Sequence, residues 1–163
     1  MEQSNRLYPA LVVLGSLAVL AAAFAFQYIG GLQPCVLCVY QRYPYGVAIA
    51  LGVVGLLLPR GRAQAVLLGL AAIVFLVEAG IAAFHVGVEQ HWWAGTEACG
   101  GAAPTSPQNL NALMQSLATQ PVRCDAIAWS MFGISMAGYN FLVALALAAF
   151  SVVAARRTWS ARS

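Results

Sequence analysis

The sequence contains no lysine and only a few charged residues of any type. Charged side chains make up 8% of the 163 residues, whereas hydrophobic residues make up 61%. A soluble globular domain has about a quarter charged residues, so this composition excludes a soluble domain, and it also excludes a disordered chain. The net charge of +3 comes from eight arginines and five acidic residues, which is too sparse a charge for nucleic-acid binding. The composition predicts an integral membrane protein surrounded by a lipid bilayer.

Four apolar stretches are long enough to cross a bilayer, whose hydrocarbon core of about 30 Å requires roughly 20 residues of α-helix. They comprise residues 9–29, 34–58, 63–85 and 126–155. These lengths predict an all-α membrane protein, a four-transmembrane-helix bundle that forms one domain over residues 1–163. Pro44 lies inside the second stretch, so we expect a kink near residues 40–43.

The first apolar stretch can also be interpreted as a secretory signal peptide. Arg6 precedes it, and Ala21-Ala22-Ala23 resembles a cleavage site. However, the apolar run from Ala10 to Phe26 is longer than the core of about 7–15 residues that signal peptides have. We therefore expect a retained membrane span.

The arginines predict the orientation of the bundle, because Lys and Arg near the ends of spans remain on the cytoplasmic side. Six of the eight lie at the N-terminus, between the second and third stretches, or at the C-terminus: Arg6, Arg60, Arg62, Arg156, Arg157 and Arg162. We therefore expect both termini in the cytoplasm, which in a bacterial-type envelope places the chain in the inner membrane. Residues 86–125 then form the second periplasmic loop.

All four cysteines face the periplasm in this orientation. Cys35 and Cys38 open the second stretch, and Cys99 and Cys124 lie in the second periplasmic loop. The periplasm is oxidising, so an even number of cysteines predicts disulfide chemistry rather than buried, reduced thiols. Two pairs are the simplest arrangement.

The first pair forms a C-x-x-C motif, Cys35-Val36-Leu37-Cys38, directly after Pro34. Proline suits the first position of a helix, and a helix N-terminus favours the thiolate form of a cysteine, which makes a disulfide labile. Arg42 follows one helical turn deeper. An arginine inside a span requires a partner such as a thiolate, a carbonyl or a carboxylate. The pattern favours a redox-active pair.

A static disulfide or half of a zinc site are the alternatives for this motif. A disulfide between residues so close in sequence closes a very short loop and stabilises the fold little. A zinc site built from four cysteines requires a second close pair, whereas Cys99 and Cys124 are 25 residues apart. We therefore favour redox chemistry and expect no metal.

The second pair, Cys99 and Cys124, is compatible with a structural disulfide that closes an external loop or with an exchange site. The C-x-x-C motif on the same membrane face favours exchange. Between the two cysteines, Ser106-Pro107 predicts the start of a short amphipathic helix with an apolar face formed by Leu110, Leu113, Met114 and Leu117. We expect this helix to lie on the membrane surface or to dock against the bundle.

The segment Pro34-Cys35-Val36-Leu37-Cys38-Val39-Tyr40-Gln41-Arg42 closely resembles the signature of the disulfide bond formation protein B (DsbB) family, which are bacterial quinone-linked thiol oxidoreductases. Residues 84–89, residues 133–140 and Cys124-Asp125 followed by Trp129 also look like that family. The similarity covers nearly the whole chain.

The resemblance implies an electron relay. A periplasmic thioredoxin-like thiol oxidase of the DsbA type, once reduced, would attack Cys99 in a disulfide between Cys99 and Cys124. Cys124 would pass the electrons to Cys35, and Cys38 would be the thiolate that faces ubiquinone, with menaquinone as an alternative from the membrane quinone pool. Arg42 would stabilise that thiolate and the quinone oxygen.

The resemblance also places His85, Met136 and Tyr139 near the quinone. Taken alone, His85 is more typical of an interfacial histidine bonded to the backbone, and Met136 and Tyr139 are more typical of packing residues. A lipid-soluble acceptor does fit the chain, because the sequence shows no haem, flavin or metal motif.

Two other classes of protein remain as alternatives. A vitamin K epoxide reductase-like enzyme also combines a four-helix bundle, a C-x-x-C motif and a quinone, but its quinone-proximal pair belongs near the last span. A non-enzymatic membrane protein with two structural disulfides is the other. Glu78, an acid inside the third stretch, has no assigned role; it and Arg42 both lie about 10 Å deep, so we expect them to pair if the spans are neighbours.

Overall fold

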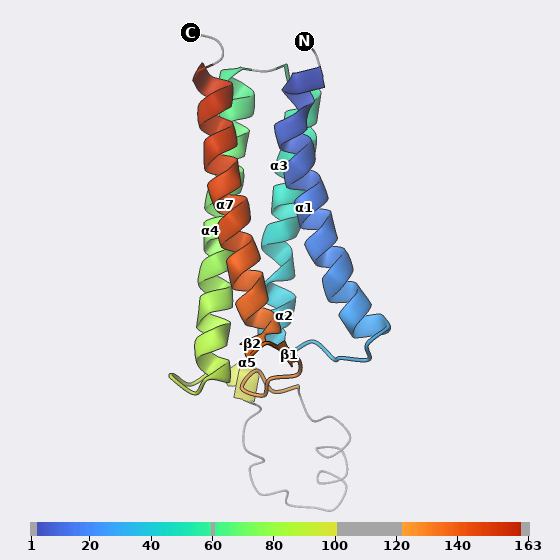
Figure 1. Cartoon of the computed structure of the whole chain (residues 1–163). Helices are drawn as coiled ribbons and strands as arrows, with labels where there is room; N and C mark the ends of the chain where they lie inside the picture. Colours follow the sequence, from blue (N-terminus) through green and yellow to red (C-terminus); the bar gives the residue numbers. More distant parts are fainter. Residues whose placement is uncertain (1–2, 60, 101–121, 161–163) are drawn as a thin grey trace, which may run out of the picture.

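The computed structural model describes residues 3–59, 61–100 and 122–160, and the described residues are mostly helical (Figure 1). The helices are α1 (Gln3–Tyr28), α2 (Val36–Tyr40), α3 (Arg42–Leu57), α4 (Arg62–Glu89), α5 (Glu97–Gly100) and α7 (Met136–Ser160), and the strands are β1 (Ser130–Met131) and β2 (Ile134–Ser135).

Three of these helices are long and apolar enough to cross a membrane: Arg6–Tyr28 in α1, Arg62–Glu89, which is α4, and Met136–Ser160, which is α7. Their length and composition support a membrane protein. The second predicted stretch is divided into α2 and α3, and α3 has only 16 residues, fewer than the roughly 20 that a span needs. The count of four spans therefore stays a prediction.

The break between α2 and α3 falls at Gln41, inside the region where a kink is predicted. Pro44 explains it, because its ring excludes the carbonyl of Tyr40 four residues earlier and it has no N–H to donate. Two short helices in one apolar stretch result, and the junction turns Gln41 and Arg42 toward the interior of the protein.

The helix of the last apolar stretch, α7, begins at Met136. This corrects the predicted start of that stretch near residue 126. β1 and β2 form an antiparallel hairpin in which Met131 pairs with Ile134. Phe132 and Gly133 at its tip have φ values of 52° and 77°, as a two-residue type I′ turn requires. α7 starts directly afterwards because Ser135 Oγ accepts a hydrogen bond from Gly138 N at 3.2 Å and so caps the helix.

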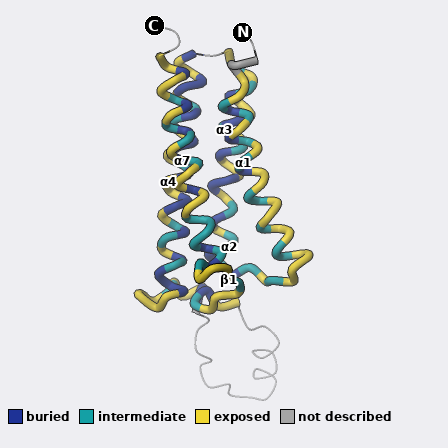
Figure 2. Tube along the Cα trace, in the orientation of Figure 1, coloured by how far each residue is buried: buried dark blue, intermediate teal, exposed yellow. Residues whose placement is uncertain are grey.

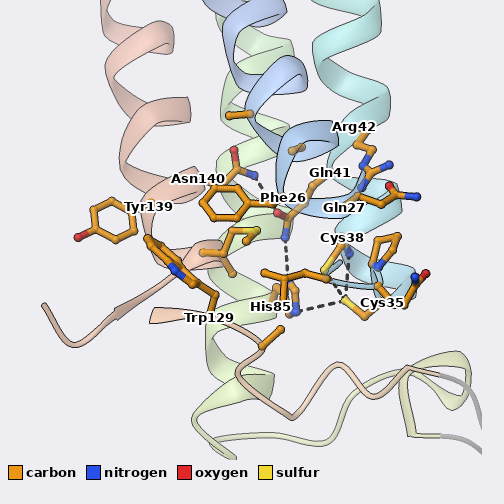
Figure 3. Close-up of a pocket in the computed structure, with 18 of the residues that line it drawn as sticks. Phe26, Gln27, Cys35, Cys38, Gln41, Arg42, His85, Trp129, Tyr139 and Asn140 are labelled. Carbon is orange, nitrogen blue, oxygen red and sulfur yellow. Dashed lines mark hydrogen bonds between the residues drawn. The ribbon is translucent and has the colours of Figure 1, made fainter. Parts of the chain in front are cut away.

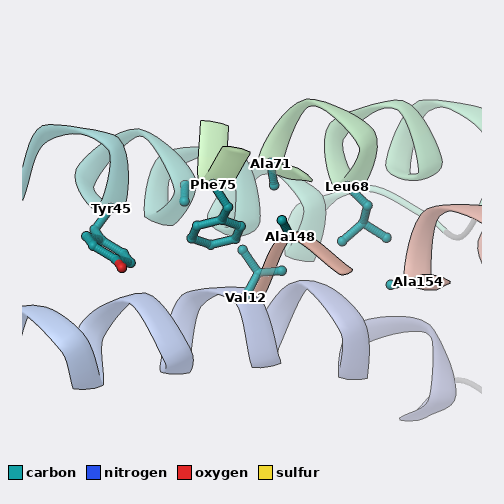
Figure 4. Close-up of a cluster of buried hydrophobic side chains, with 8 residues drawn as sticks. Val12, Tyr45, Leu68, Ala71, Phe75, Ala148 and Ala154 are labelled. Atoms are coloured by element: carbon teal, nitrogen blue, oxygen red, sulfur yellow. The ribbon is translucent and has the colours of Figure 1, made fainter. Parts of the chain in front are cut away.

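The long helices lie side by side, and α1 begins at the end of the bundle where α7 ends (Figure 1). α4 packs along α7, and α3 packs between α1 and α4. Their buried faces point inward and their exposed faces outward (Figure 2). The core contains Val12, Tyr45, Leu68, Ala71, Phe75 and Ala148 (Figure 4). Exposed leucines such as Leu14, with 60% of its surface accessible, suit a surface that faces lipid.

Glycines bring α1 and α3 close together. A Cβ on Gly52 would lie 3.1 Å from the Pro9 carbonyl oxygen and 2.6 Å from Val13 Cγ2. Small residues of this kind allow helix backbones to approach inside a membrane.

The end of the bundle opposite the two chain termini carries α2, α5 and the hairpin (Figure 1). We refer to it as the cysteine end. The chain leaves α4 there and folds back, so that Trp93 Nε1 donates to the Phe84 carbonyl at 3.0 Å. The indole of Trp93 packs directly onto Gly87, which leaves the chain in position to enter α5. The predicted amphipathic helix at residues 106–117 lies outside the described residues.

Candidate active site

Cys35 and Cys38 form a close pair of free thiols at the start of α2. Their sulfur atoms lie 2.6 Å apart. Cys35 is the N-cap residue of α2, and its Sγ accepts a hydrogen bond from Cys38 N at 3.2 Å. The helix therefore begins at Val36, with Pro34 just outside it, and the turn geometry holds the two sulfurs ready to form a disulfide.

Cys99 and Cys124 form a disulfide. The backbone reinforces it, because Cys124 N donates to the Cys99 carbonyl at 3.2 Å. Thr96 Oγ1 donates to Cys99 Sγ at 3.4 Å. This disulfide joins α5 to the segment that leads into the hairpin.

Both cysteine pairs belong to one buried cluster. Cys35, Cys99 and Cys124 are buried together with Leu37 of α2 and Val88 of α4, and Cys38 packs against this group. Cys124 is fully buried and Cys99 is 3% exposed. The fold thus brings together two thiol pairs that are more than 60 residues apart in the sequence.

His85 of α4 lies between the free pair and Gln41, the residue that joins α2 to α3 (Figure 3). Its Nε2 atom lies 3.5 Å from Cys35 Sγ, and Gln41 Nε2 donates to its Nδ1 atom at 3.0 Å. A neutral imidazole carries one proton, so a ring whose Nδ1 accepts carries that proton on Nε2. His85 therefore presents an N–H group to Cys35.

This tautomer also bears on metal binding. The sulfurs of Cys35 and Cys38 and a ring nitrogen of His85 lie within 4.8 Å of one another, as metal ligands do. A metal requires the lone pair of the ring nitrogen, whereas the hydrogen bond from Gln41 leaves a proton on the nitrogen that faces the sulfurs. The arrangement favours a thiol pair over a metal centre.

Glu89 lies one turn beyond His85 on α4, with its Oε1 atom 3.9 Å from His85 Nε2. That separation is too long for a hydrogen bond. Ser135 Oγ donates a short hydrogen bond to Glu89 Oε2, which fastens the hairpin to the end of α4.

A cavity of about 410 Å³ opens beside the free cysteines. Its lining is largely apolar and includes Phe26 of α1, Trp129 near the hairpin, and Met136 and Tyr139 of α7, together with Cys35, Cys38, Arg42 and His85. All the residues that the sequence assigns to a quinone thus line one cavity that also contains the C-x-x-C sulfurs.

Arg42 supplies a cationic group to this cavity. Its guanidinium carbon lies 4.8 Å from the centroid of the Phe24 ring, within the range of a cation–π interaction. Its Nε atom is buried and has no hydrogen-bond partner among the described residues. A buried N–H donor without a partner is available to a ligand oxygen.

Tyr139 contributes its ring, rather than its hydroxyl group, to the lining of the cavity. The hydroxyl donates to the Met131 carbonyl at 3.0 Å, which ties α7 to the hairpin. The ring centroid lies 6.0 Å from that of Trp129, which in turn lies 5.1 Å from that of Phe26. These rings form an aromatic wall of the cavity (Figure 3).

Glu78 does not pair with Arg42, so that prediction is wrong. Within the described residues, the partner of Glu78 is Asn140 of α7, whose Nδ2 donates to Glu78 Oε1 at 2.6 Å. α3 and α4 are neighbours, but Arg42 lies against Phe24 of α1 whereas Glu78 bonds to α7.

Sequence reasoning gave Gln41 and Asn140 no individual role, although both line the cavity and bond to one another. The available signal was their polarity. An amide inside an apolar membrane stretch requires a polar partner, as a charged residue does.

The fold and site define a helical membrane protein with two cysteine pairs clustered at one end of its bundle, one of them beside an apolar cavity. The model of the family "Disulfide bond formation protein DsbB" matches residues 5–154 of the chain. The chain belongs to this family.

Curated relatives agree. The chain is 28% identical over 154 residues to disulfide bond formation protein B of Dechloromonas aromatica, covering 91% of this chain and 90% of the relative. It is 32% identical over 152 residues to the protein of the same name from Albidiferax ferrireducens, covering 88% and 83%. It is also 30% identical over 138 residues to an uncharacterized protein of Rickettsia prowazekii, covering 83% and 78%. No solved structure matches the chain.

Proposed function

We propose that this protein reoxidises a periplasmic thioredoxin-like thiol oxidase of the DsbA type by passing electrons through its two cysteine pairs to a membrane quinone. The single observation that carries this proposal is the cluster in which the Cys99–Cys124 disulfide is buried together with Cys35, with Cys38 packed against it. Thiol–disulfide exchange requires direct contact between sulfurs, and family membership supports a role in disulfide formation.

The relay moves one electron pair inward through four exchanges. A thiolate of the partner attacks Cys99, and the Cys99–Cys124 bond breaks with its electron pair on Cys124. Cys124 then attacks Cys35 in an oxidised Cys35–Cys38 pair, and Cys38 leaves as the thiolate. The second thiol of the partner closes the partner's own disulfide and releases Cys99 as a thiolate. Cys99 finally attacks Cys124 in the Cys35–Cys124 disulfide, which restores the Cys99–Cys124 bond and leaves the electron pair on Cys35.

The cavity residues suit a quinone. A bound quinone supplies an acceptor for two electrons and two protons. The unpartnered Nε–H of Arg42 provides a donor for a carbonyl oxygen, and the rings of Phe26, Trp129 and Tyr139 provide an apolar wall. We propose ubiquinone as the acceptor, with menaquinone as the alternative, and Met136 as a further contact.

The membrane topology completes the proposal. α2 and α3 together would form the second of four spans, and the cysteine end would face the periplasm of a bacterial inner membrane. Both termini would then lie in the cytoplasm, where the arginines near the opposite end of the bundle are retained.

A vitamin K epoxide reductase-like arrangement is less consistent with the chain. It would place the quinone-proximal pair near the last span, whereas α7 contains no cysteine. The non-enzymatic alternative requires two static disulfides, and it gives no reason for a thiol pair beside an apolar cavity with a buried cation.

The experiment is quinone reduction by the purified protein in lipid nanodiscs, with a reduced thioredoxin-like partner as donor. We expect Cys38→Ser to abolish turnover. Ser151→Ala removes a buried hydroxyl that has no hydrogen-bond partner in the described part of the chain, and it should leave turnover unchanged. A partner that lacks its resolving cysteine should be trapped as a mixed disulfide with Cys99. Quinone reduction that survives in Cys38→Ser would refute the relay.

A further inference from the structure

Glu78 is the one acidic side chain in the middle of α4, and the relay gives it no task. It is fully buried, and its Oε1 atom accepts a hydrogen bond from Asn140 Nδ2 at 2.6 Å. Its Oε2 atom has no hydrogen-bond partner among the described residues. Because an acid inside an apolar span is costly, its retention there requires a reason beyond packing.

Glu78 determines which way the amide of Asn140 points. An acceptor oxygen selects the NH2 group of an amide, not its carbonyl. The same NH2 group also donates to Gln41 Oε1 at 2.8 Å, and Asn140 Oδ1 accepts from the Tyr45 hydroxyl at 2.6 Å. Both polar groups of the Asn140 amide therefore have partners, and all of these hydrogen bonds require the same orientation of the amide.

The orientation of the Asn140 amide in turn fixes the orientation of the Gln41 amide, which bonds to His85. Because its carbonyl oxygen faces Asn140, its NH2 group faces His85 and donates to Nδ1 at 3.0 Å. The ring proton must then reside on Nε2, 3.5 Å from Cys35 Sγ. The hydrogen bonds form an unbroken chain from Glu78 to the reactive pair, and most of it is visible in Figure 3.

We propose that Glu78 is a positioning residue that fixes the tautomer of His85 through Asn140 and Gln41, so that an N–H group rather than a lone pair faces Cys35. The tautomer is a property of the chain alone, whereas its consequence rests on the proposed function. When a Cys99 thiolate attacks Cys124 in a Cys35–Cys124 disulfide, the new bond joins Cys99 and Cys124 and the electron pair leaves on Cys35. An N–H donor at Cys35 stabilises that leaving thiolate.

An exchange of the two groups at the far end of this chain tests the proposal. The double variant Glu78→Gln/Asn140→Asp keeps one carboxyl and one amide of nearly the same shapes. Its carboxylate, now at position 140, accepts hydrogen bonds from the new amide at position 78, from the Tyr45 hydroxyl and from the NH2 group of Gln41. Gln41 must then turn its carbonyl oxygen toward His85, which moves the ring proton to Nδ1.

The readout is the nitrogen-15 NMR spectrum of the histidine ring in the full-length protein with reduced Cys35 and Cys38. The sequence has two histidines, so His91→Gln in every sample leaves His85 alone. We expect the Nε2–H tautomer in the parent protein and the Nδ1–H tautomer in the double variant. An unchanged tautomer in a folded double variant would overturn the proposal.

Two further variants make the result decisive. Glu89→Gln changes the other carboxyl near His85, and because Glu89 is 3.9 Å from Nε2 we expect no change of tautomer; inversion there would assign the role to Glu89. If the double variant fails to fold, the single variant Glu78→Gln tests the proposal instead. An amide at position 78 can accept from Asn140 or donate to it, so it no longer selects one orientation of the Asn140 amide. It should give signals of both tautomers, and one unmixed parental signal would refute the role of Glu78.

Activity provides the separate test of the consequence. Quinone reduction by the double variant should fall roughly ten-fold, the effect of one hydrogen bond to a charged group. A tautomer that inverts without any change in turnover would overturn the assigned consequence. Absence of turnover in the parent protein would instead count against the proposed function, and the NMR result would remain independent of it.

Discussion

The guanidinium of Arg42 lies over the ring of Phe24, 4.8 Å from its centroid, while the Nε atom has no hydrogen-bond partner among the described residues. The ring stacks against the planar cation, and Arg42, with its unused donor, is among the residues that line the cavity. Lysine cannot reproduce this arrangement, because its ammonium group is a point charge without a stacking plane.

Arg42→Gln should therefore weaken the interaction with quinone. The loss of one hydrogen bond from a charged donor corresponds to about 1.5–3 kcal/mol, so we expect KM for ubiquinone to rise roughly ten-fold or more. Arg42→Lys should recover only part of this loss. Arg156→Gln is the matched control, because Arg156 is exposed and lies near the end of α7 that is remote from the cysteines. An equal effect of Arg42→Gln and Arg156→Gln would contradict a specific role for Arg42.

Gly87 determines how the chain beyond α4 reaches the Cys99–Cys124 disulfide. A Cβ at this position would overlap the indole of Trp93, whose Nε1 donates to the Phe84 carbonyl. Gly87→Ala should displace the indole and loosen the path to Cys99, which is buried in the parent protein. We expect dithiothreitol to reduce the disulfide several-fold faster, measured by alkylation and mass spectrometry.

Gly80→Ala is the control for this change. Gly80 lies on the same helix, and a Cβ there meets nothing within 4 Å. In the Gly80→Ala variant, dithiothreitol should reduce the Cys99–Cys124 disulfide at the parental rate. If both variants are reduced equally fast, the contact between Trp93 and Gly87 does not protect the disulfide.

The close approach of α1 and α3 predicts a second glycine effect, on stability. Gly52→Ala places a methyl group 3.1 Å from the Pro9 carbonyl oxygen and 2.6 Å from Val13 Cγ2. Overpacking of this kind costs about 1–3 kcal/mol, so the unfolding midpoint should decrease in a thermal scan. Gly46→Ala on the same helix, where a Cβ meets nothing within 4 Å, should not decrease it. A loss of stability in both variants would point to backbone effects instead of helix packing.

The long helices and the gathering of cysteines at one end could be predicted from sequence, because the length of each apolar stretch and the position of each charge follow directly from the order of the residues. The break at Gln41 was also predictable, since Pro44 prevents a continuous helix whatever surrounds it. These features are local, and no knowledge of the neighbouring helices is required.

The partners of the buried polar residues were not predictable in the same way. Equal depth suggested Arg42 as the partner of Glu78, but pairing also depends on how each helix is rotated about its axis. The rotation directs Glu78 toward Asn140 of α7, the helix along which α4 packs. The hairpin escaped prediction because its turn requires a positive φ at Phe132, a conformation that phenylalanine seldom adopts.

Ser135 joins the hairpin, α4 and α7 through a single hydroxyl group. Its Oγ donates to Glu89 and accepts from Gly138 N, the third residue of α7. Ser135→Ala removes the helix cap and leaves Glu89 buried without this donor, so we expect a loss of about 1–3 kcal/mol in the free energy of unfolding. Ser130→Ala is the control, because Ser130 pairs with Ser135 in the hairpin but is exposed. Ser135→Thr, which keeps the hydroxyl, should restore most of the lost stability. If alanine at position 130 destabilises the protein as much as alanine at position 135, the effect belongs to the hairpin and not to the bond with Glu89.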